Sequence, residues 1–363
     1  MKIRWPGIKI LDRYIIGKFL STYFFAIAMI IVIVVIFDYV EKIDDFTSLK
    51  APLKAILFDY YLNFIPFFIN QFSGLFTFIA VIFFTSKMAY QTEIVAMLSG
   101  GMSFRRLMWP YFLGALIITS LSLTLNLWVI PVSQRSVVEF ESQYRQRRLS
   151  YQYDKHIYRQ VEPGVFAYVR GYTNRTGQAT FFALESYDGS TMTASLEAAE
   201  AKFNPETKRW TAPRYITRAF DSLGVETFSQ HRNLDTLINL EATELGRVNE
   251  LIQTMNITQL NEFLAQQRAK GSDSINIIEV ERHARFAYPL ATFILTLIGV
   301  SLSSRKVRGG TGLHIGIGTG LCFSYILFNR FFEEFAKSGT LPPGLAVWIP
   351  NIIYLGIAVY LYR

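Results

Sequence analysis

The chain has 363 residues, of which 51% are hydrophobic, and its formal net charge is +8. This charge does not indicate a nucleic-acid partner, because residues 131–285 hold 19 Lys and Arg against 19 Asp and Glu, and the excess lies in the more apolar remainder. With Cys322 as the single cysteine, an intramolecular disulfide is excluded.

Six blocks of the chain contain no Asp, Glu, Lys or Arg, three before and three after a long mixed stretch. They are Phe19–Phe37, Tyr60–Ser86, Leu107–Gln134, Phe286–Ser304, Gly309–Asn329 and Ser338–Tyr362. About 20 apolar residues in a helix cross the hydrocarbon core of a bilayer, and a helix satisfies its own backbone hydrogen bonds there. The sequence therefore predicts an α-helical membrane protein with six transmembrane helices, arranged as three plus three.

The expected elements follow in chain order. Residues 1–134 form an N-terminal membrane part with spans near 16–37, 55–86 and 107–132 and a short helix near 91–99. Residues 135–285 form an inserted domain, and residues 286–363 form a C-terminal membrane part with spans near 286–304, 310–330 and 343–362. Ahead of the first span, Ile8–Lys18 mixes apolar and charged residues, which predicts a separate helix lying on the membrane surface.

The short loops differ in charge. The N-terminal stretch and the loops that contain Arg105 and Arg308 are basic, whereas the loop after the first span is rich in acids. Short loops rich in Lys and Arg stay in the cytoplasm. We therefore expect a multi-pass protein of the bacterial inner membrane, with both termini in the cytoplasm and residues 135–285 in the periplasm.

The inserted domain has the pattern of an all-β domain. Val165–Tyr172, Thr180–Ser186 and Tyr215–Phe220 are short strand-like runs, and a turn at Asn204–Thr207 predicts a hairpin. Several short strands at close spacing favour a jelly-roll-like layer. A helix is expected near 258–270, since apolar residues follow a helical period there and Gly271 can end it.

Two kinds of site that could drive transport are missing from the sequence. There is no G-x-x-x-x-G-K-[ST] phosphate loop, and no Asp or Glu lies deep in a span, where proton- or sodium-driven carriers place one. Nothing predicts a metal or catalytic site. Any driving force is therefore expected from a partner. In the fifth span, Gly312, Gly316 and Gly320 lie four residues apart, a spacing that predicts close helix packing within the subunit or a moving contact.

The loop between the second and third spans has the pattern of a short amphipathic helix followed by glycines. Within it, Glu93-Ile94-Val95-Ala96-Met97, then Gly101 and Ser103, resemble the coupling helix of the LptF/LptG permeases, the membrane part of the bacterial lipopolysaccharide exporter. The resemblance extends along the membrane region. It includes Leu11–Ile15, Pro66, Pro110, Pro342-Pro343 and Pro350. Leu11–Ile15 and Phe37–Lys42 are more similar to LptG than to LptF.

This resemblance implies a permease subunit of an ATP-driven exporter. Such a subunit takes lipopolysaccharide from the outer leaflet of the inner membrane and passes it to a periplasmic bridge. The implied partners are an LptB-like ATPase dimer, an LptF-like permease or a second copy of this chain, LptC/LptA-like β-domains and lipopolysaccharide. The resemblance implies no enzyme activity and no cofactor in this chain, with ATP and Mg bound by the ATPase.

The resemblance also assigns residues to the two contacts. Those that couple to the ATPase are Glu93, Ile94, Met97, Gly100 and Arg105. Lys42 matches a lysine-bearing position that meets lipopolysaccharide phosphate, and Arg135 is a similar candidate. From the residues alone, a solvated acid near a helix N-terminus is the preferred interpretation of Glu93, and the resemblance reverses that preference. The alternative for Lys42 is an interfacial lysine paired with Glu41, Asp44 or Asp45.

Two other functions are compatible with the layout of the sequence. One is a non-transporting envelope scaffold, and the other is an intramembrane lipid-modifying enzyme. The enzyme would need acid, base or nucleophilic groups at one membrane depth, and the spans contain no such cluster. ATPase activity that copurifies with the protein would distinguish a transporter from a scaffold.

Overall fold

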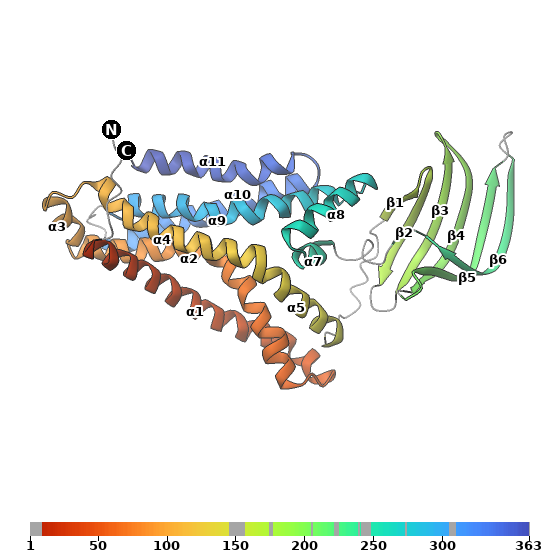
Figure 1. Ribbon diagram of the computed structural model, residues 1–363, viewed down its shortest axis with the longest axis horizontal. Coiled ribbons are helices and arrows are strands. Elements are labelled where there is room, and N and C mark those ends of the chain that lie inside the picture. Colours follow the sequence, from red (N-terminus) through yellow and green to blue (C-terminus); the bar gives the residue numbers. More distant parts are fainter. Residues whose placement is uncertain are drawn as a thin grey trace. The chain divides into compact units, whose positions relative to one another are not determined.

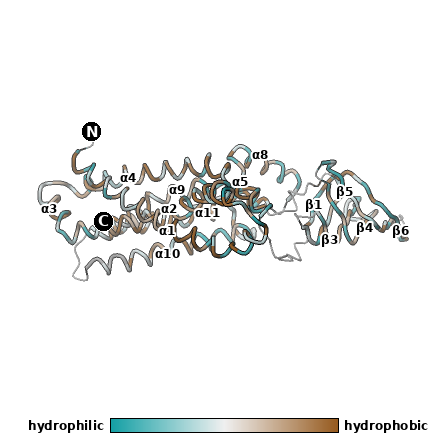
Figure 2. The backbone as a smooth tube through the Cα atoms, turned by 90° about the horizontal axis from the view of Figure 1, so that it is seen from below, coloured by the Kyte–Doolittle hydropathy of each residue, from teal (hydrophilic) through white to brown (hydrophobic). Residues whose placement is uncertain are grey.

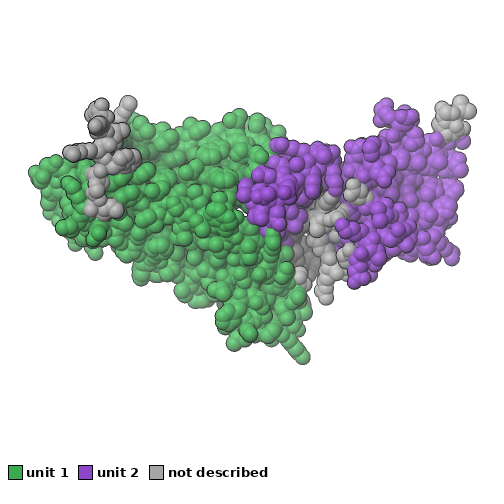
Figure 3. Space-filling view, in the orientation of Figure 1, with its two compact units in different colours: residues 1–144, 279–363 green, residues 145–278 purple. Residues whose placement is uncertain are grey.

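The computed structural model describes residues 9–144, 157–173, 177–204, 206–220, 225–238, 240, 248–272, 274–304 and 310–362. The chain forms two compact units, which Figure 3 shows in different colours. The first consists of residues 1–144 and 279–363, and the second of residues 145–278.

The first unit is helical (Figure 1). Its elements are α1 (Ile10–Ser48), the π-helix η1 (Ala55–Tyr61), α2 (Leu62–Tyr90), α3 (Glu93–Ser99), α4 (Phe104–Thr124), the π-helix η2 (Leu125–Val129), α5 (Ile130–Tyr144), α9 (Ile275–Ser303), α10 (Gly310–Lys337) and α11 (Pro343–Tyr362). Because η1 leads directly into α2, and η2 joins α4 to α5, each of these runs is one continuous helical rod.

Five described helical runs are long and apolar enough to cross a membrane. They are α1, η1–α2, α4–η2–α5, α9 and α11. Figure 2 shows hydrophobic residues along these helices. The fifth expected span coincides with α10, a helix of 28 residues that is not among the five.

The expected surface helix over Ile8–Lys18 is wrong, because α1 runs without a break from Ile10 to Ser48. Asp12 and Lys18 contact Arg106 and Glu93 of the same unit, so these charges do not require a helix that lies flat on the membrane. Ile15 and Phe19 continue the buried stripe of α1 towards its N-terminus, with exposed fractions of 1% and 0%.

Among the described glycines, the closest helix approaches are those at Gly114 and Gly318. A Cβ atom added at Gly114 on α4 would lie 2.4 Å from Cδ1 of Phe19 on α1. One added at Gly318 on α10 would lie 2.1 Å from Cδ1 of Ile82 on α2. Small residues let helix backbones come close in a membrane protein. Gly114 therefore fixes how near α1 and α4 lie, and Gly318 does the same for α2 and α10.

The second unit contains one antiparallel sheet (Figure 1). Its strands are β1 (Ile157–Glu162), β2 (Val165–Thr173), β3 (Gln178–Asp188), β4 (Thr191–Asn204), β5 (Arg209–Phe220) and β6 (Glu226–Leu237). Each strand pairs with its neighbour in sequence, so their spatial order is β1-β2-β3-β4-β5-β6.

This strand order differs from the jelly-roll-like arrangement that we expected. A jelly roll places two Greek keys in two sheets, whereas the described strands form a meander in a single sheet. The short connections between consecutive strands explain the difference, because they hold too few residues to carry the chain into a second sheet. At the β1–β2 turn, Gly164 has a φ of +78°, and a Cβ there would lie 2.8 Å from the carbonyl oxygen of Tyr187.

One face of the sheet carries the core of the second unit. Trp210 on β5 is fully buried, stacks on Phe182 at 5.2 Å and donates a hydrogen bond from Nε1 to the carbonyl of Leu240 at 3.0 Å. Burial raises the pKa of Tyr172, beside Trp210, to about 12, so this phenol stays neutral at physiological pH. β6 lies at the edge of the sheet, and most of its residues are exposed.

Two short helices, α7 (Val248–Gln253) and α8 (Ile257–Ala269), follow the sheet in sequence. The side chain of Asn256 accepts from the amide of Gln259 at 2.9 Å, and the Gln259 side chain accepts from the amide of Asn256 at 3.1 Å. This reciprocal pair is a capping box, which explains why α8 begins at Ile257.

Candidate functional site at helix α3

The short helix α3 is separated from its neighbours by non-helical backbone at both ends. Thr92 has a φ of +60°, a left-handed conformation that ends the helical path of α2. After α3, Gly101 has a φ of +88°, which an L residue rarely adopts. Ser103 then begins α4, since its hydroxyl accepts a hydrogen bond from the amide of Arg106 at 3.2 Å. α3 is thus a distinct element between two long helices.

One face of α3 is buried against the rest of the first unit. Ile94 is 1% exposed and lies in a hydrophobic cluster with Ile15 and Phe19 of α1 and Leu107 of α4, and Met97 packs against the same cluster. We expected Ile94 and Met97 to contact an ATPase, but in the structure they pack α3 against α1 and α4 of the same chain.

Beside this buried face, the surface of α3 is exposed and apolar. Val95 is 49% exposed and Leu98 is 37% exposed, and Ala96 lies between them on the surface. The sequence analysis did not assign these residues to the site. Their spacing of three residues was a visible signal, because residues that far apart share one side of a helix.

Glu93 is held by α1. Its Oε2 accepts a hydrogen bond from the Tyr14 hydroxyl at 2.9 Å, and its Oε1 lies 3.7 Å from Nζ of Lys18. The side chain of Glu93 remains 29% exposed. Glu93 therefore contacts α1 within the chain, while part of its side chain stays accessible to solvent.

The remaining two residues assigned to coupling lie on the surface. Arg105, in the first turn of α4, is exposed. Gly100, just after α3, is also exposed, and a Cβ added to it would lie 3.3 Å from the carbonyl oxygen of Ala96. A side chain at Gly100 would therefore crowd the last turn of α3.

Lys42, the candidate phosphate ligand, is 7% exposed and lies in an ionic cluster. Its ammonium is 2.7 Å from Oδ1 of Asp38 and 3.2 Å from Oε1 of Glu141, and it also donates to the Tyr60 hydroxyl. An ammonium has three N–H donors, and three acceptors within the chain use them. Lys42 does not pair with Glu41, Asp44 or Asp45, the alternative partners that we had considered.

The sequence analysis missed the other members of this cluster. Tyr60 and Tyr61 donate to the two oxygens of Asp38, each at 3.2 Å, and Glu141 comes from α5. The four-residue spacing of Asp38 and Lys42 was a visible signal for an ion pair on one helix face. Together the cluster joins α1, η1 and α5.

The comparison with protein families decides which family the chain belongs to. The lipopolysaccharide export system permease family LptF/LptG matches residues 13–363. The chain is an LptF/LptG permease. Comparison with curated protein sequences gives no match.

Membership of this family makes the chain a permease subunit of lipopolysaccharide export that is not itself an enzyme. Its apolar helices are those of a multi-pass membrane protein, and the family is one of the inner membrane. Partners from the lipopolysaccharide export system follow from the same membership. The match covers LptF and LptG alike, so the closer similarity to LptG remains a prediction.

The structure of the permease does not support close packing at the predicted glycine stripe. Gly312, Gly316 and Gly320 are exposed, and a Cβ atom added at any of them would lie within 4 Å of no atom in the part of the chain that the structure describes. The close approach within the chain is made instead by Gly318, on another side of α10. Helical geometry explains the shift, because residues two apart lie on different faces of a helix.

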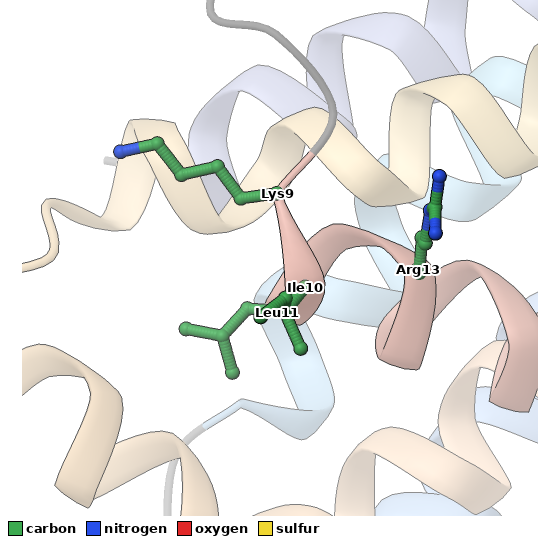
Figure 4. A pocket seen from close by; sticks show the side chains of 4 residues that line it. All are labelled: Lys9, Ile10, Leu11 and Arg13. Atoms are coloured by element: carbon green, nitrogen blue, oxygen red, sulfur yellow. The ribbon is translucent and has the colours of Figure 1, made fainter.

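Two further places in the permease carry basic residues. Arg135, the second candidate phosphate ligand, is exposed on α5. A pocket at the start of α1 is lined by Lys9, Ile10, Leu11 and Arg13 (Figure 4). In that view the side chains of Lys9 and Arg13 extend in different directions, so they do not converge on one anion.

Proposed function

We propose that this permease converts the motions of a partner ATPase into the extraction of lipopolysaccharide from the outer leaflet of the inner membrane. The observation that carries the proposal is α3, which is anchored by Ile94 and presents an exposed apolar face at Val95 and Leu98 between two long helices. An apolar helix face of this kind fits a groove on a protein partner. Arg105, exposed beside it, adds a charged rim.

The proposed topology has six spans, with α10 as the fifth, and places both termini and α3 in the cytoplasm. Its support is the charge asymmetry of the short loops. Residues 310–329 of α10 contain no Asp, Glu, Lys or Arg, which fits a span. In this topology the six-stranded sheet lies in the periplasm.

Cysteine labelling tests this topology. We expect an impermeant maleimide applied to intact spheroplasts to label Ser190→Cys, in the β3–β4 turn, and not Ser99→Cys, on α3, since both positions are exposed and lie on opposite sides of the membrane. Cys322, the natural cysteine of the chain, is buried, so we expect the maleimide not to label it. Labelling of Ser99→Cys without Ser190→Cys would invert the proposed orientation.

The proposed partners are an LptB-like ATPase dimer, a second permease and LptC/LptA-like β-domains. We assign this chain to the LptG branch, with an LptF-like permease as its partner. The exposed strand β6 supports the contact with a β-domain, because an edge strand offers unpaired backbone groups to a strand of another protein. For the substrate we retain Arg135, whose exposed guanidinium suits a phosphate.

The test of this function is purification in mild detergent followed by reconstitution into proteoliposomes. We expect a soluble ATPase to copurify, and lipopolysaccharide to leave the vesicles only when ATP is present and an acceptor β-domain is added. A stable complex without ATPase would support a scaffold. Covalently altered lipid without release would support the lipid-modifying enzyme.

A further inference from the structure

Residues near the start of α1 contact the chain at both ends of α3. On one side, the Arg106 guanidinium, in the first turn of α4, binds Asp12 with two hydrogen bonds of 2.7 and 2.6 Å. Asp12 is 2% exposed and also accepts from the amide of Lys9 at 2.7 Å, which fixes its rotamer. A bidentate Arg–carboxylate pair holds orientation as well as distance.

On the other side, Tyr14 and Lys18 of α1 hold Glu93, the first residue of α3. Nζ of Lys18 lies over the Tyr14 ring, 4.4 Å from its centroid, so the two α1 side chains form a unit. This contact is about one-third exposed, so solvent screens it more than the Asp12–Arg106 pair. We call Asp12, Tyr14, Lys18, Glu93 and Arg106 the α1 clasp.

An apolar centre lies between the two ends of the clasp. Ile15 and Phe19 of α1 share a buried cluster with Ile94 of α3 and Leu107 of α4. Side chains three and four residues apart lie on one helix face, which places Asp12, Ile15 and Phe19 in a single row. The row makes α1 contact α3 and the start of α4 together.

The covalent connections of α3 to α2 and α4 are short non-helical segments. Gln91 and Thr92 separate α3 from α2, and Gly100–Ser103 separate it from α4, all with non-helical backbone. Short non-helical segments can absorb a rotation as a hinge does. A displacement of α3 would therefore be taken up at these segments unless the clasp holds α3 to α1.

We propose that Asp12, Tyr14 and Lys18 are positioning residues that make α3 and the start of α1 move as one body. A displacement imposed on α3 then reaches α1, the longest helix of the chain, directly rather than through the short non-helical segments. The inference rests on the proposed function, in which an ATPase displaces α3. It gives Glu93 a contact inside the chain, through Lys18 and Tyr14, beside any contact that its exposed part makes with a partner.

A charge reversal on α1 in the full complex tests this inference. Lys18→Glu places a second carboxylate beside Glu93 and leaves residue 93 itself unchanged, together with any contact that it makes with the ATPase. It should lower the lipopolysaccharide released per ATP hydrolysed several-fold while the complex retains its ATPase. An unchanged ratio in Lys18→Glu would overturn the proposal.

A distance measurement tests the clasp without any partner. Spin labels at Ser21→Cys on α1 and Ser99→Cys on α3, both exposed, should give a narrow distance distribution in the otherwise unchanged permease. The distribution should broaden with Asp12→Asn and, less, with Tyr14→Phe, which removes only a hydroxyl. Tyr360→Phe, at an 80% exposed position on α11, is the matched control and should change nothing.

The two measurements separate the two proposals. Unchanged distributions in Asp12→Asn and Tyr14→Phe would overturn the clasp even if the complex exports lipopolysaccharide normally. Absence of ATP-dependent release by the unaltered complex would instead refute the proposed function, and the distance distributions would still decide whether the clasp joins α3 to α1.

Discussion

Replacing Lys42 with methionine is expected to lower the free energy of unfolding by about 3–5 kcal/mol, because it removes one partner of a buried ion pair. Methionine keeps an unbranched chain of similar length but leaves Asp38 and Glu141 without their cation. The side chains of these two acids are only 12% and 18% exposed, so water compensates little. The measurement is the thermal unfolding midpoint of the purified permease in detergent.

A matched control and a rescue make this result specific. Lys54→Met changes the same residue type at an exposed position near η1 and should leave the midpoint unchanged. Adding Asp38→Asn to Lys42→Met removes one stranded charge and should recover part of the loss. If Lys42→Met unfolds like the unaltered protein but loses affinity for lipopolysaccharide, Lys42 is a substrate ligand and its ionic cluster opens in the working complex.

Replacing Val95 with aspartate is expected to reduce the ATPase retained on the purified complex about thirtyfold, since a central interface residue contributes about 2 kcal/mol or more. Val95 is half exposed on the apolar face of α3, so a carboxylate there reaches water in the free permease but is desolvated against a partner. The membrane content of the variant should stay normal. ATPase activity per mole of permease is the measurement.

The control for Val95→Asp makes the same change elsewhere. Val225, just before β6, is 60% exposed, and Val225→Asp should retain all of the ATPase. Leu98→Asp, on the same face of α3, should behave like Val95→Asp. Normal ATPase retention by both α3 variants would show that α3 is not the docking element.

The apolar helices could be predicted because their signal lies within single segments. A charge-free run near the length of the bilayer core is a local property, and so is the capping box at Asn256 and Gln259 that begins α8. The sequence could not show that the start of α1 continues into its span, because mixed polarity there arises from Asp12 and Lys18, whose partners lie elsewhere in the chain.

The contacts of the candidate site could be predicted only in part. The resemblance led to Glu93, but its partner Tyr14 is 79 residues away in sequence, and no local pattern pairs them. For Lys42, the nearby Asp38 was visible in the sequence, whereas Glu141 is 99 residues away. The glycine spacing in α10 predicted that Gly312, Gly316 and Gly320 pack against another helix. Which glycine is covered depends on the position of the neighbouring helix α2, and the spacing of the glycines does not give that position.

The meander of the sheet also bears on how the protein is made. Every pairing joins strands that are adjacent in sequence, so each hairpin can close soon after its second strand has been synthesised. Contacts of short sequence separation form quickly and at a small loss of chain entropy. Assembly can therefore proceed strand by strand from β1, and the last strand to join is β6, which stays at the open edge.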